Sequence, residues 1–119
     1  RNAKSDPGSE TAGLSPFITE AIGYINANLF TLSGVREVSD SLYVSEQYLF
    51  RQFQAQLKTT PKKYINFKRL LYAQDMIRRG MKPTEIYPAC GFQSYPGFYK
   101  QYVKMFGYPP SRENGITLK

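Results

Sequence analysis

Large apolar side chains recur at α-helical spacing along most of this chain. The first such stretch runs from Pro16, which can open a helix, to about Asn28. A short second stretch begins at Ser33 or Gly34, and a third follows Ser45, which is a typical helix-capping residue. A short helix, a tight turn and a Ser-capped helix together indicate a helix-turn-helix unit.

The longest helical stretch starts at Pro61, runs to about Arg79 and ends at Gly80. Its apolar residues cover more than one side, so we expect this helix to connect two lobes and to contribute to both cores. A second short helix is expected over residues 83–89, where Pro88 should kink it or end it early.

One pattern occurs twice, at an interval of 94 − 45 = 49 residues. The positions that match at equal offsets are Ser45, Leu49, Phe50, Arg51, Gln52, Phe53 and Pro61 in the first copy, and Ser94, Phe98, Tyr99, Lys100, Gln101, Tyr102 and Pro110 in the second. Such a repeat indicates one supersecondary unit used twice, with Ser94 capping a helix that ends near Met105. The sequence therefore predicts an all-α fold of two helix-turn-helix subdomains joined by a long connecting helix.

The charge balance favours a polyanionic partner. The 119 residues include 16 Lys and Arg against 9 Asp and Glu, which gives a net charge of +7 and a pI near 9.6. Such a balance is typical of nucleic-acid-binding proteins. The alternative interpretation is that the charge reflects only an ordinary basic surface of a soluble protein. The length suits one compact domain or two small lobes that share a core.

Several kinds of chemistry are not expected. Histidine is absent and Cys90 is the only cysteine, so the chain lacks the commonest general base and metal ligand and can form no internal disulfide. We expect no enzyme, metal or cofactor, and we expect Cys90 to be a small buried residue rather than a redox switch. No apolar run approaches the ~20 residues of a membrane span, so no membrane partner is expected and the predicted compartment is the cytoplasm.

The ends of the chain differ in composition from the rest. Residues 1–15 are polar and predict a flexible linker or an expression remnant, and the lack of an initiator Met suggests the C-terminal piece of a longer protein. We expect the residues after Pro110, from Arg112 onward, to fray, and 115–119 to be a tail. The domain then spans 16–114, divided into a first lobe (16–60), a connecting helix (61–80) and a second lobe (81–114).

Two strings of residues carry a family resemblance. The first string is Val38, Ser39, Leu42, Ser45, Leu49, Arg51, Phe53, Pro61, Tyr64, Ile65, Arg69, Ala73 and Ile77. The second is Glu85, Ile86, Gly91, Phe92, Phe98, Lys100, Tyr102, Gly107 and Pro110, and it contains the more specific run G-F-x-[SD]-x3-F-x3-[FY]-x4-G-x2-P. On these residues the chain, from about Phe17 to Asn114, resembles the C-terminal DNA-binding domain of AraC/XylS-type transcriptional regulators.

The resemblance implies about seven helices and two recognition helices that enter successive major grooves of double-stranded DNA. About 18 helical residues at ~1.5 Å rise give a connecting helix near ~27 Å, comparable with the ~34 Å turn of DNA. A single chain could thus cover two adjacent half-sites without dimerising. An N-terminal effector-binding and dimerisation region is expected outside this chain, and RNA polymerase is a further candidate partner.

The chain departs from the family pattern at several positions. Ser39 and Tyr87 stand where the short helices usually carry alanine, and Lys58 replaces a glycine. Glu113 and Asn114 replace the Tyr-Arg pair after the last proline. Because several departures fall in the second lobe, two roles stay open for it, namely base reading with weaker direct contacts or anchoring mainly on phosphate.

Candidate base-reading residues lie on the solvent side of the first Ser-capped helix, in its first two turns. Arg51 can donate two hydrogen bonds to guanine, and Gln47 or Gln54 can pair with adenine. Phe50 can touch a thymine methyl group. Glu46 can accept from cytosine, and it equally suits the positive end of the helix.

The equivalent positions of the second lobe offer fewer bidentate groups. Tyr95, Tyr99 and Lys100 are the candidates for base readout there, and Pro96 and Val103 occupy the other equivalent positions. We expect the two tyrosines to contact sugar or phosphate and the lysine to supply charge.

Candidate phosphate contacts lie at helix starts and on lysines, and they are Ser45, Thr60, Lys62, Lys63, Ser94 and Lys104. The two serines are helix caps first. Other basic side chains can equally be a solvated face, namely Lys68, Arg78, Arg79 and Lys82. Arg69 matches a family position that is usually structural, so it is not a binding candidate.

The leading hypothesis is a sequence-specific DNA-binding domain of a bacterial transcription regulator. The alternative is a protein-interaction module, in which a degenerate second lobe and its exposed tyrosines bind a partner protein. Salt dependence separates the two, because DNA binding weakens with a log-log slope near −0.9 per neutralised phosphate.

Overall fold

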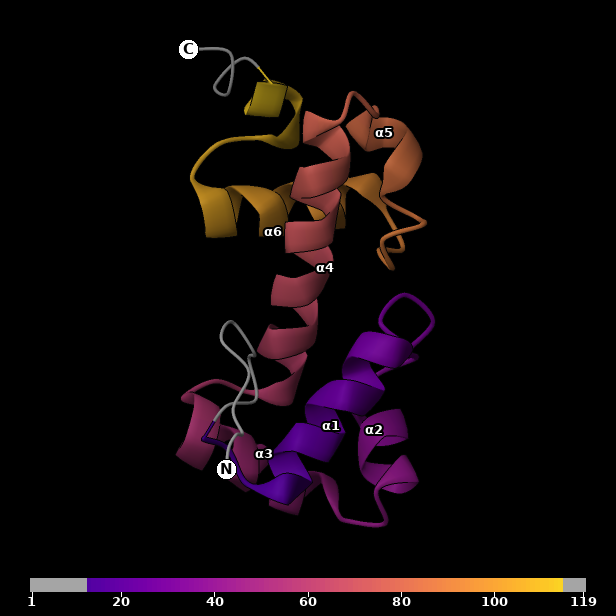
Figure 1. Ribbon diagram of the computed structural model, residues 1–119. Coiled ribbons are helices and arrows are strands. Elements are labelled where there is room, and N and C mark those ends of the chain that lie inside the picture. Colours follow the sequence, from indigo (N-terminus) through magenta and orange to yellow (C-terminus); the bar gives the residue numbers. More distant parts are fainter. Residues whose placement is uncertain (1–12, 115–119) are drawn as a thin grey trace. The chain divides into compact units, whose positions relative to one another are not determined.

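The computed structural model describes residues 13–114, and all of its regular secondary structure over that range is helical (Figure 1). Six α-helices and a final 3₁₀ turn follow one another, namely α1 (Pro16–Ala27), α2 (Val35–Ser41), α3 (Glu46–Leu57), α4 (Pro61–Arg78), α5 (Pro83–Ile86), α6 (Tyr95–Phe106) and η1 (Pro110–Arg112). The expectation of two helix-turn-helix subdomains and a long connecting helix is confirmed. The predicted tail at 115–119 and most of the predicted linker, residues 1–12, lie outside the described residues.

The described chain divides into two compact units. The first unit comprises residues 13–28 and 32–62, and the second comprises 29–31 and 63–114. The first unit therefore holds α1 to α3, and the second holds almost all of α4 together with α5 and α6.

The core of the first unit forms where α1, α2 and α3 pack on one another. Ser15 caps α1 by accepting a hydrogen bond from the amide of Ile18 at 3.2 Å, which fixes where the buried face of the helix begins. The residues that fill this core are Ile18, Ala21, Ile22 and Ile25 from α1, Val38 from α2, and Leu49 and Phe53 from α3. Their helical spacing is the reason that the sequence predicted these elements.

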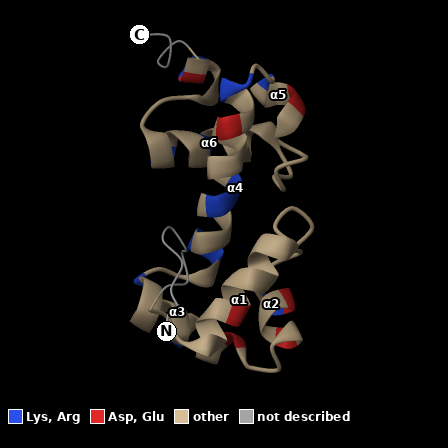
Figure 2. Cartoon of the chain, in the orientation of Figure 1, with Lys and Arg blue, Asp and Glu red and all other residues tan. Residues whose placement is uncertain are grey.

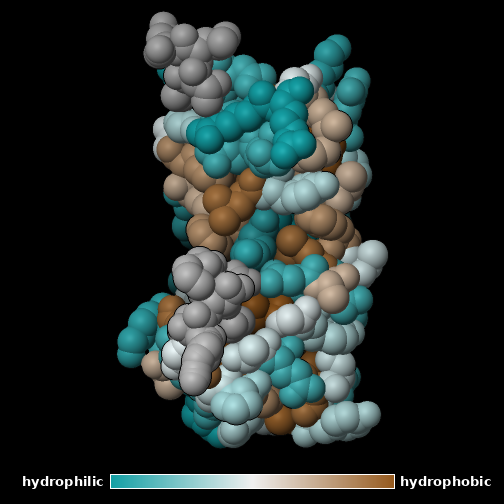
Figure 3. Space-filling model, in the orientation of Figure 1, coloured by the Kyte–Doolittle hydropathy of each residue, from teal (hydrophilic) through white to brown (hydrophobic). Residues whose placement is uncertain are grey.

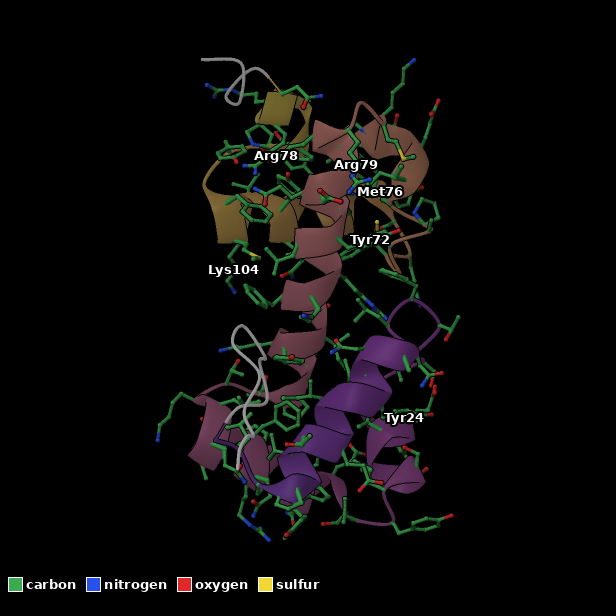
Figure 4. The ribbon with its side chains drawn as sticks, in the orientation of Figure 1. Tyr24, Tyr72, Met76, Arg78, Arg79 and Lys104 are labelled. Atoms are coloured by element: carbon green, nitrogen blue, oxygen red, sulfur yellow. The ribbon has the colours of Figure 1, made fainter. Side chains whose placement is uncertain are left out.

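A polar cluster ties α2 to α1 inside the first unit. The Glu37 carboxylate accepts hydrogen bonds from the Tyr24 hydroxyl at 2.9 Å and from the amide of Ser33 at 3.1 Å (Figure 4). The Ser33 amide just precedes the N-cap residue Gly34, so the carboxylate satisfies an amide at the start of α2. These hydrogen bonds, from the Ser33 amide first and then from Tyr24, lower the pKa of Glu37.

The core of the second unit is rich in aromatic residues. Its buried members are Leu70, Ala73 and Ile77 from α4, Ile86 from α5, Cys90, and Phe98 and Tyr102 from α6. The ring centroids of Phe98 and Tyr102 lie 5.6 Å apart, and Phe92 meets Phe98 edge-on at 5.1 Å. Cys90 is buried as expected, and burial raises the pKa of its thiol to about 11.

Arg69 holds together three segments of the second unit. Its Nε donates to the carbonyl of Leu29 at 2.9 Å, and one terminal nitrogen donates to the carbonyl of Gly91 at 3.2 Å. Gly91 has a φ of +93°, and a Cβ added there would lie 2.6 Å from the Arg69 Nε. A glycine at this position therefore leaves room for the guanidinium as well as permitting the left-handed backbone.

The short helix α5 ends at Ile86, before Pro88, as the proline predicted. The expectation of fraying after Pro110 is wrong for the residues that the structure describes. Glu113 is fully buried, and the Asn114 side chain donates to the carbonyl of Ile77 at 2.9 Å. The sequence alone gave no reason to expect a buried carboxylate, because its partners lie far away along the chain.

The partners of Glu113 come from α4 and α6. Its carboxylate accepts from the Tyr102 hydroxyl at 2.5 Å, from Arg78 Nε at 2.7 Å and from the Gln74 amide at 3.3 Å. Figure 4 labels Arg78 on α4, in the same region as the C-terminal turn. Burial acts to raise the pKa of Glu113, but the hydrogen bonds, led by that of Tyr102, outweigh it and lower the pKa.

Candidate nucleic-acid interface

The start of α3 is built by its serine cap. The Ser45 side chain accepts a hydrogen bond from the amide of Tyr48 at 3.0 Å, and Glu46 lies in the first turn. The cap confirms the predicted start of this helix. The other amides of the first turn have no acceptor within the helix. Both residues are exposed.

The side of α3 turned away from the core carries the predicted base-reading side chains. Leu49 and Phe53 are buried, whereas an exposed face is formed at i, i+3, i+4 and i+7 by Gln47, Phe50, Arg51 and Gln54. We call these four residues the α3 face. Phe50 is 46% exposed, although it is a large apolar side chain.

The equivalent side of α6 has different chemistry. Ser94 caps this helix by accepting from the amide of Gly97 at 3.2 Å, and Pro96 occupies the first turn. The positions that correspond to the α3 face are Pro96, Tyr99, Lys100 and Val103, which we call the α6 face. It offers one cation and one hydroxyl but no amide side chain.

Tyr95 differs from the other predicted contacts of α6 because its ring is partly buried. It packs against Tyr87 at a centroid distance of 5.7 Å and against Phe98 at 5.9 Å. Burial, and then the neighbouring Tyr99, raise the pKa of Tyr95. Tyr99 is 40% exposed and lies beside Tyr95 at 6.1 Å between ring centroids.

The predicted phosphate contacts fall at the start of α4 and the end of α6. Thr60 is half-buried just before Pro61, while Lys62 and Lys63 are exposed in the first turn of α4. Lys104 is exposed in the last turn of α6 (Figure 4). Figure 2 shows Lys and Arg positions, coloured blue, at intervals along α4.

Two basic side chains at the C-terminal end of α4 already pair with acids, namely Arg78, its last residue, and Arg79, which follows it. Arg78 binds Glu113, and Arg79 lies 3.0 Å from the carboxylate of Asp75 one turn away (Figure 4). Both pairs involve partly exposed arginines, so they leave much of each guanidinium in solvent.

Comparison with known proteins identifies the family. A family model described as a helix-turn-helix domain matches residues 38–113. A transcriptional regulator with an AraC-type DNA-binding domain from Chromobacterium violaceum has a solved structure that is 31% identical, with a TM-score of 0.77 over 84% of this chain and 90% of that one. The chain belongs to the AraC-type helix-turn-helix family. This is a family of transcriptional regulators rather than a class of enzymes.

Two further relatives of this AraC-type domain define its extent and its fold. The HTH-type transcriptional regulator GbdR of Pseudomonas aeruginosa is 33% identical over 99 residues, which are 82% of this chain but 27% of GbdR. The DNA-binding domain of AdpA, solved with a target DNA, is 19% identical and shares the fold at a TM-score of 0.78 over 86% of this chain and 93% of that one. The chain thus spans about a quarter of the length of GbdR.

Departures from the AraC-type pattern have local structural consequences. Ser39 is buried and donates to the carbonyl of Arg36 at 3.0 Å, so its hydroxyl is satisfied within α2. Lys58 ends α3 with a φ of 58°, the left-handed conformation that a glycine adopts more easily. Tyr87 packs its ring against Tyr95 and Phe98 of α6.

One exposed aromatic residue of this AraC-type domain was absent from the predicted site. Tyr43 lies in the turn between α2 and α3 and is 94% exposed. Sequence spacing gave no signal for it, because the turn was too short to show any periodicity. The sequence did offer one indication. Tyr43 is an aromatic residue that lies two positions before the Ser45 cap and has no apolar neighbour at helical spacing.

The described residues show neither a metal-binding cluster nor a membrane-spanning helix. Over residues 13–114, no three or more Cys, Asp or Glu side chains gather in a way that could hold a metal ion. Within the same range, no helix has both the length and the apolar character that crossing a membrane requires.

Proposed function

We propose that this chain is a sequence-specific double-stranded DNA-binding domain of a bacterial transcription regulator, acting in the cytoplasm. The observation that carries the proposal is the α3 face, which gathers one guanidinium, two amides and one aromatic ring on the exposed side of a Ser-capped helix. These groups match base edges in the major groove. A recognition helix presents its N-terminal turns to those edges.

Each member of the α3 face has a distinct role in this proposal. Arg51 donates two hydrogen bonds to a guanine, and Gln47 or Gln54 pairs with an adenine. Phe50 contacts a thymine methyl, which accounts for a large apolar ring on an otherwise polar face. Glu46 accepts from cytosine or stabilises the positive end of α3.

The distribution of charge supports different roles for the two units. Among the described residues, the first unit carries four Lys and Arg against four Asp and Glu, whereas the second carries nine against three. The second unit thus has a net charge of +6 and the first has none. Electrostatic attraction to phosphate therefore comes mainly from the second unit, and base recognition mainly from the first.

In the second unit we assign α6 chiefly to backbone contacts. Lys100 and Lys104 supply charge, and Tyr99 contacts sugar or phosphate, with the exposed edge of Tyr95 beside it. The N-terminal turn of α4, with Thr60, Lys62 and Lys63, and the two serine caps add phosphate contacts. Both recognition helices would enter successive major grooves, so one chain covers two half-sites.

Relatives support the proposal at the level of the domain. The AdpA domain was solved in complex with a target DNA, and GbdR is a transcriptional regulator. Because the chain spans 27% of GbdR, an effector-binding or dimerisation region and a contact with RNA polymerase belong to a whole regulator and are likewise proposals.

A protein-interaction module is the second candidate function. Several large apolar side chains are exposed, among them Phe67, Leu71 and Tyr72 on α4. Figure 3 shows apolar patches that interrupt an otherwise hydrophilic surface on one face of the molecule. A protein partner would bind these patches with little dependence on salt.

Selection from a pool of randomised duplexes tests the proposal directly. We expect enrichment of one sequence, with the strongest preferences in the half-site that α3 contacts and weak ones in the other. Affinity for the selected duplex should fall steeply with salt, by about 0.9 log units per log unit of salt for each phosphate neutralised. A selection that enriches no sequence would contradict base reading, and binding insensitive to salt would favour the interaction module.

A further inference from the structure

We propose that Tyr43 is a DNA-backbone contact, with its hydroxyl donating a hydrogen bond to a phosphate at the edge of the groove that α3 enters. This inference rests on the proposed DNA-binding function. It adds a residue that neither the repeat nor the family pattern marks as a contact.

The backbone of Tyr43 is in an unfavourable conformation. Its φ is 60°, which places a bulky aromatic residue in the left-handed region at the C-terminal end of α2. The Tyr43 amide donates to the carbonyl of Asp40 at 3.1 Å, and the next amide, of Val44, donates to Ser39 at 3.0 Å. These two bonds close a helix-ending motif in which glycine is the usual residue, because it has no Cβ to strain.

The side chain of Tyr43 contributes little to the fold. It is 94% exposed, and within residues 13–114 its hydroxyl has no hydrogen-bond partner. A strained backbone that supports an unused side chain is a typical mark of a functional position. The fold alone would favour glycine here.

The second copy of the repeat has glycine at the equivalent helix-ending position. The amide of Gly91, whose φ is 93°, donates to the carbonyl of Pro88 at 3.0 Å, and the next amide, of Phe92, donates to the carbonyl of Tyr87 at 3.1 Å. Of these two turns, only the one that precedes α3 has an aromatic residue in the left-handed position.

The position of this turn identifies the partner. Tyr43 precedes Ser45, the N-cap of α3, by two residues, so it lies beside the end of the helix that presents the α3 face. When a recognition helix enters the major groove by its N-terminal turns, the preceding helix and turn cross the sugar-phosphate backbone. Tyrosine is among the side chains that commonly donate to phosphate oxygens there.

Tyr43→Phe is the decisive variant, because it removes only the hydroxyl and keeps the ring and the backbone strain. We expect its affinity to fall about three- to tenfold, the loss of one hydrogen bond to a charged acceptor. The loss should be equal for the selected duplex and for a scrambled duplex of the same length, since phosphate carries no sequence information. The salt slope should stay unchanged, because a neutral hydroxyl releases no counterion.

Tyr43→Gly tests the strain independently. It should raise Tm by a few degrees while weakening DNA binding at least as much as Tyr43→Phe does. A Tyr43→Phe variant that binds both duplexes as tightly as the wild type would overturn the inference, as would a Tyr43→Gly variant with no gain in Tm. Failure of the wild-type chain to bind either duplex would instead contradict the proposed function itself.

Discussion

The basic residues of this domain include some that bind backbone carbonyls and others that face solvent. Arg69 has the charge of a DNA contact, yet it is partly buried and binds the carbonyls of Leu29 and Gly91. Burial lowers its pKa, and two carbonyl acceptors occupy its nitrogens. Arg51 is exposed on the α3 face. Both residues are arginines, so residue type does not distinguish the structural role of Arg69 from the DNA-contact role proposed for Arg51. The position of each residue on its helix does.

Arg51→Ala should weaken binding by about 1–3 kcal/mol and relax the preference at one base pair. The expected cause is the loss of a bidentate pair with guanine. Titration of the selected duplex and of its single-base variants measures both effects. Lys63→Ala is the comparison, because the loss of a phosphate contact should weaken all sequences alike. Equal losses on every duplex for Arg51→Ala would contradict its assignment to a base.

Gly91→Ala should destabilise the fold by about 2–4 kcal/mol, measured by chemical denaturation. The new Cβ would meet the Arg69 Nε at 2.6 Å, so the guanidinium must leave its two carbonyl partners. Gly107→Ala is a matched control, since its φ is also positive but no atom lies within 4 Å of the added Cβ. The control should lose only about 1 kcal/mol. Similar losses of stability in the two variants would mean that the Arg69 side chain moves away from the added Cβ at little cost in free energy.

At the scale of elements, helix ends decide much of this architecture. Ser15, Ser45 and Ser94 each accept a hydrogen bond from an amide of the helix that they start. The C-terminal turn η1 is different, because the chain just after it is held by tertiary contacts of Glu113 rather than by a local cap. That turn is therefore sensitive to the charge of one carboxylate.

Acid should weaken this attachment. The pKa of Glu113 is lowered in the folded state, so the unfolded chain takes up a proton first as the pH falls. The stabilisation is complete above the unfolded pKa of about 4.3 and is lost as the pH falls through the lower, folded value. Glu113→Gln should be less stable than the wild type by about 1–3 kcal/mol at neutral pH, with a gap that narrows below about pH 4. Denaturation curves at several pH values test this, and a gap independent of pH would contradict it.

At the scale of the whole molecule, charge is divided unequally between the two units. The base-reading groups of α3 belong to a unit without net charge, and the +6 of the other unit includes Lys100 and Lys104. Sequence preference and overall affinity are therefore expected to respond to different substitutions. The two units share the repeated core pattern and a similar fold, but their exposed residues differ in chemistry.

The double variant Lys100→Gln, Lys104→Gln should reduce the steepness of the salt dependence by up to about 1.8, with little change in the selected sequence. Its physical cause is the loss of two phosphate neutralisations. Arg79→Gln is the control, because Arg79 already pairs with Asp75 at 3.0 Å and has no assigned DNA contact. We expect the control to leave the slope unchanged. If the double variant has the same salt slope as the wild type, the assignment of phosphate contacts to α6 is wrong.

The sequence by itself determined the helices, the caps Ser45 and Ser94, the early end of α5 before Pro88, the burial of Cys90 and the family. These features depend on periodicity, capping and fixed spacing, which act over a few residues. Only the tertiary structure decided that Glu113 is buried, that Arg69 binds backbone carbonyls, and that the ring of Tyr43 is exposed. Those outcomes depend on contacts between segments far apart in the chain, and local patterns carry no information about such contacts.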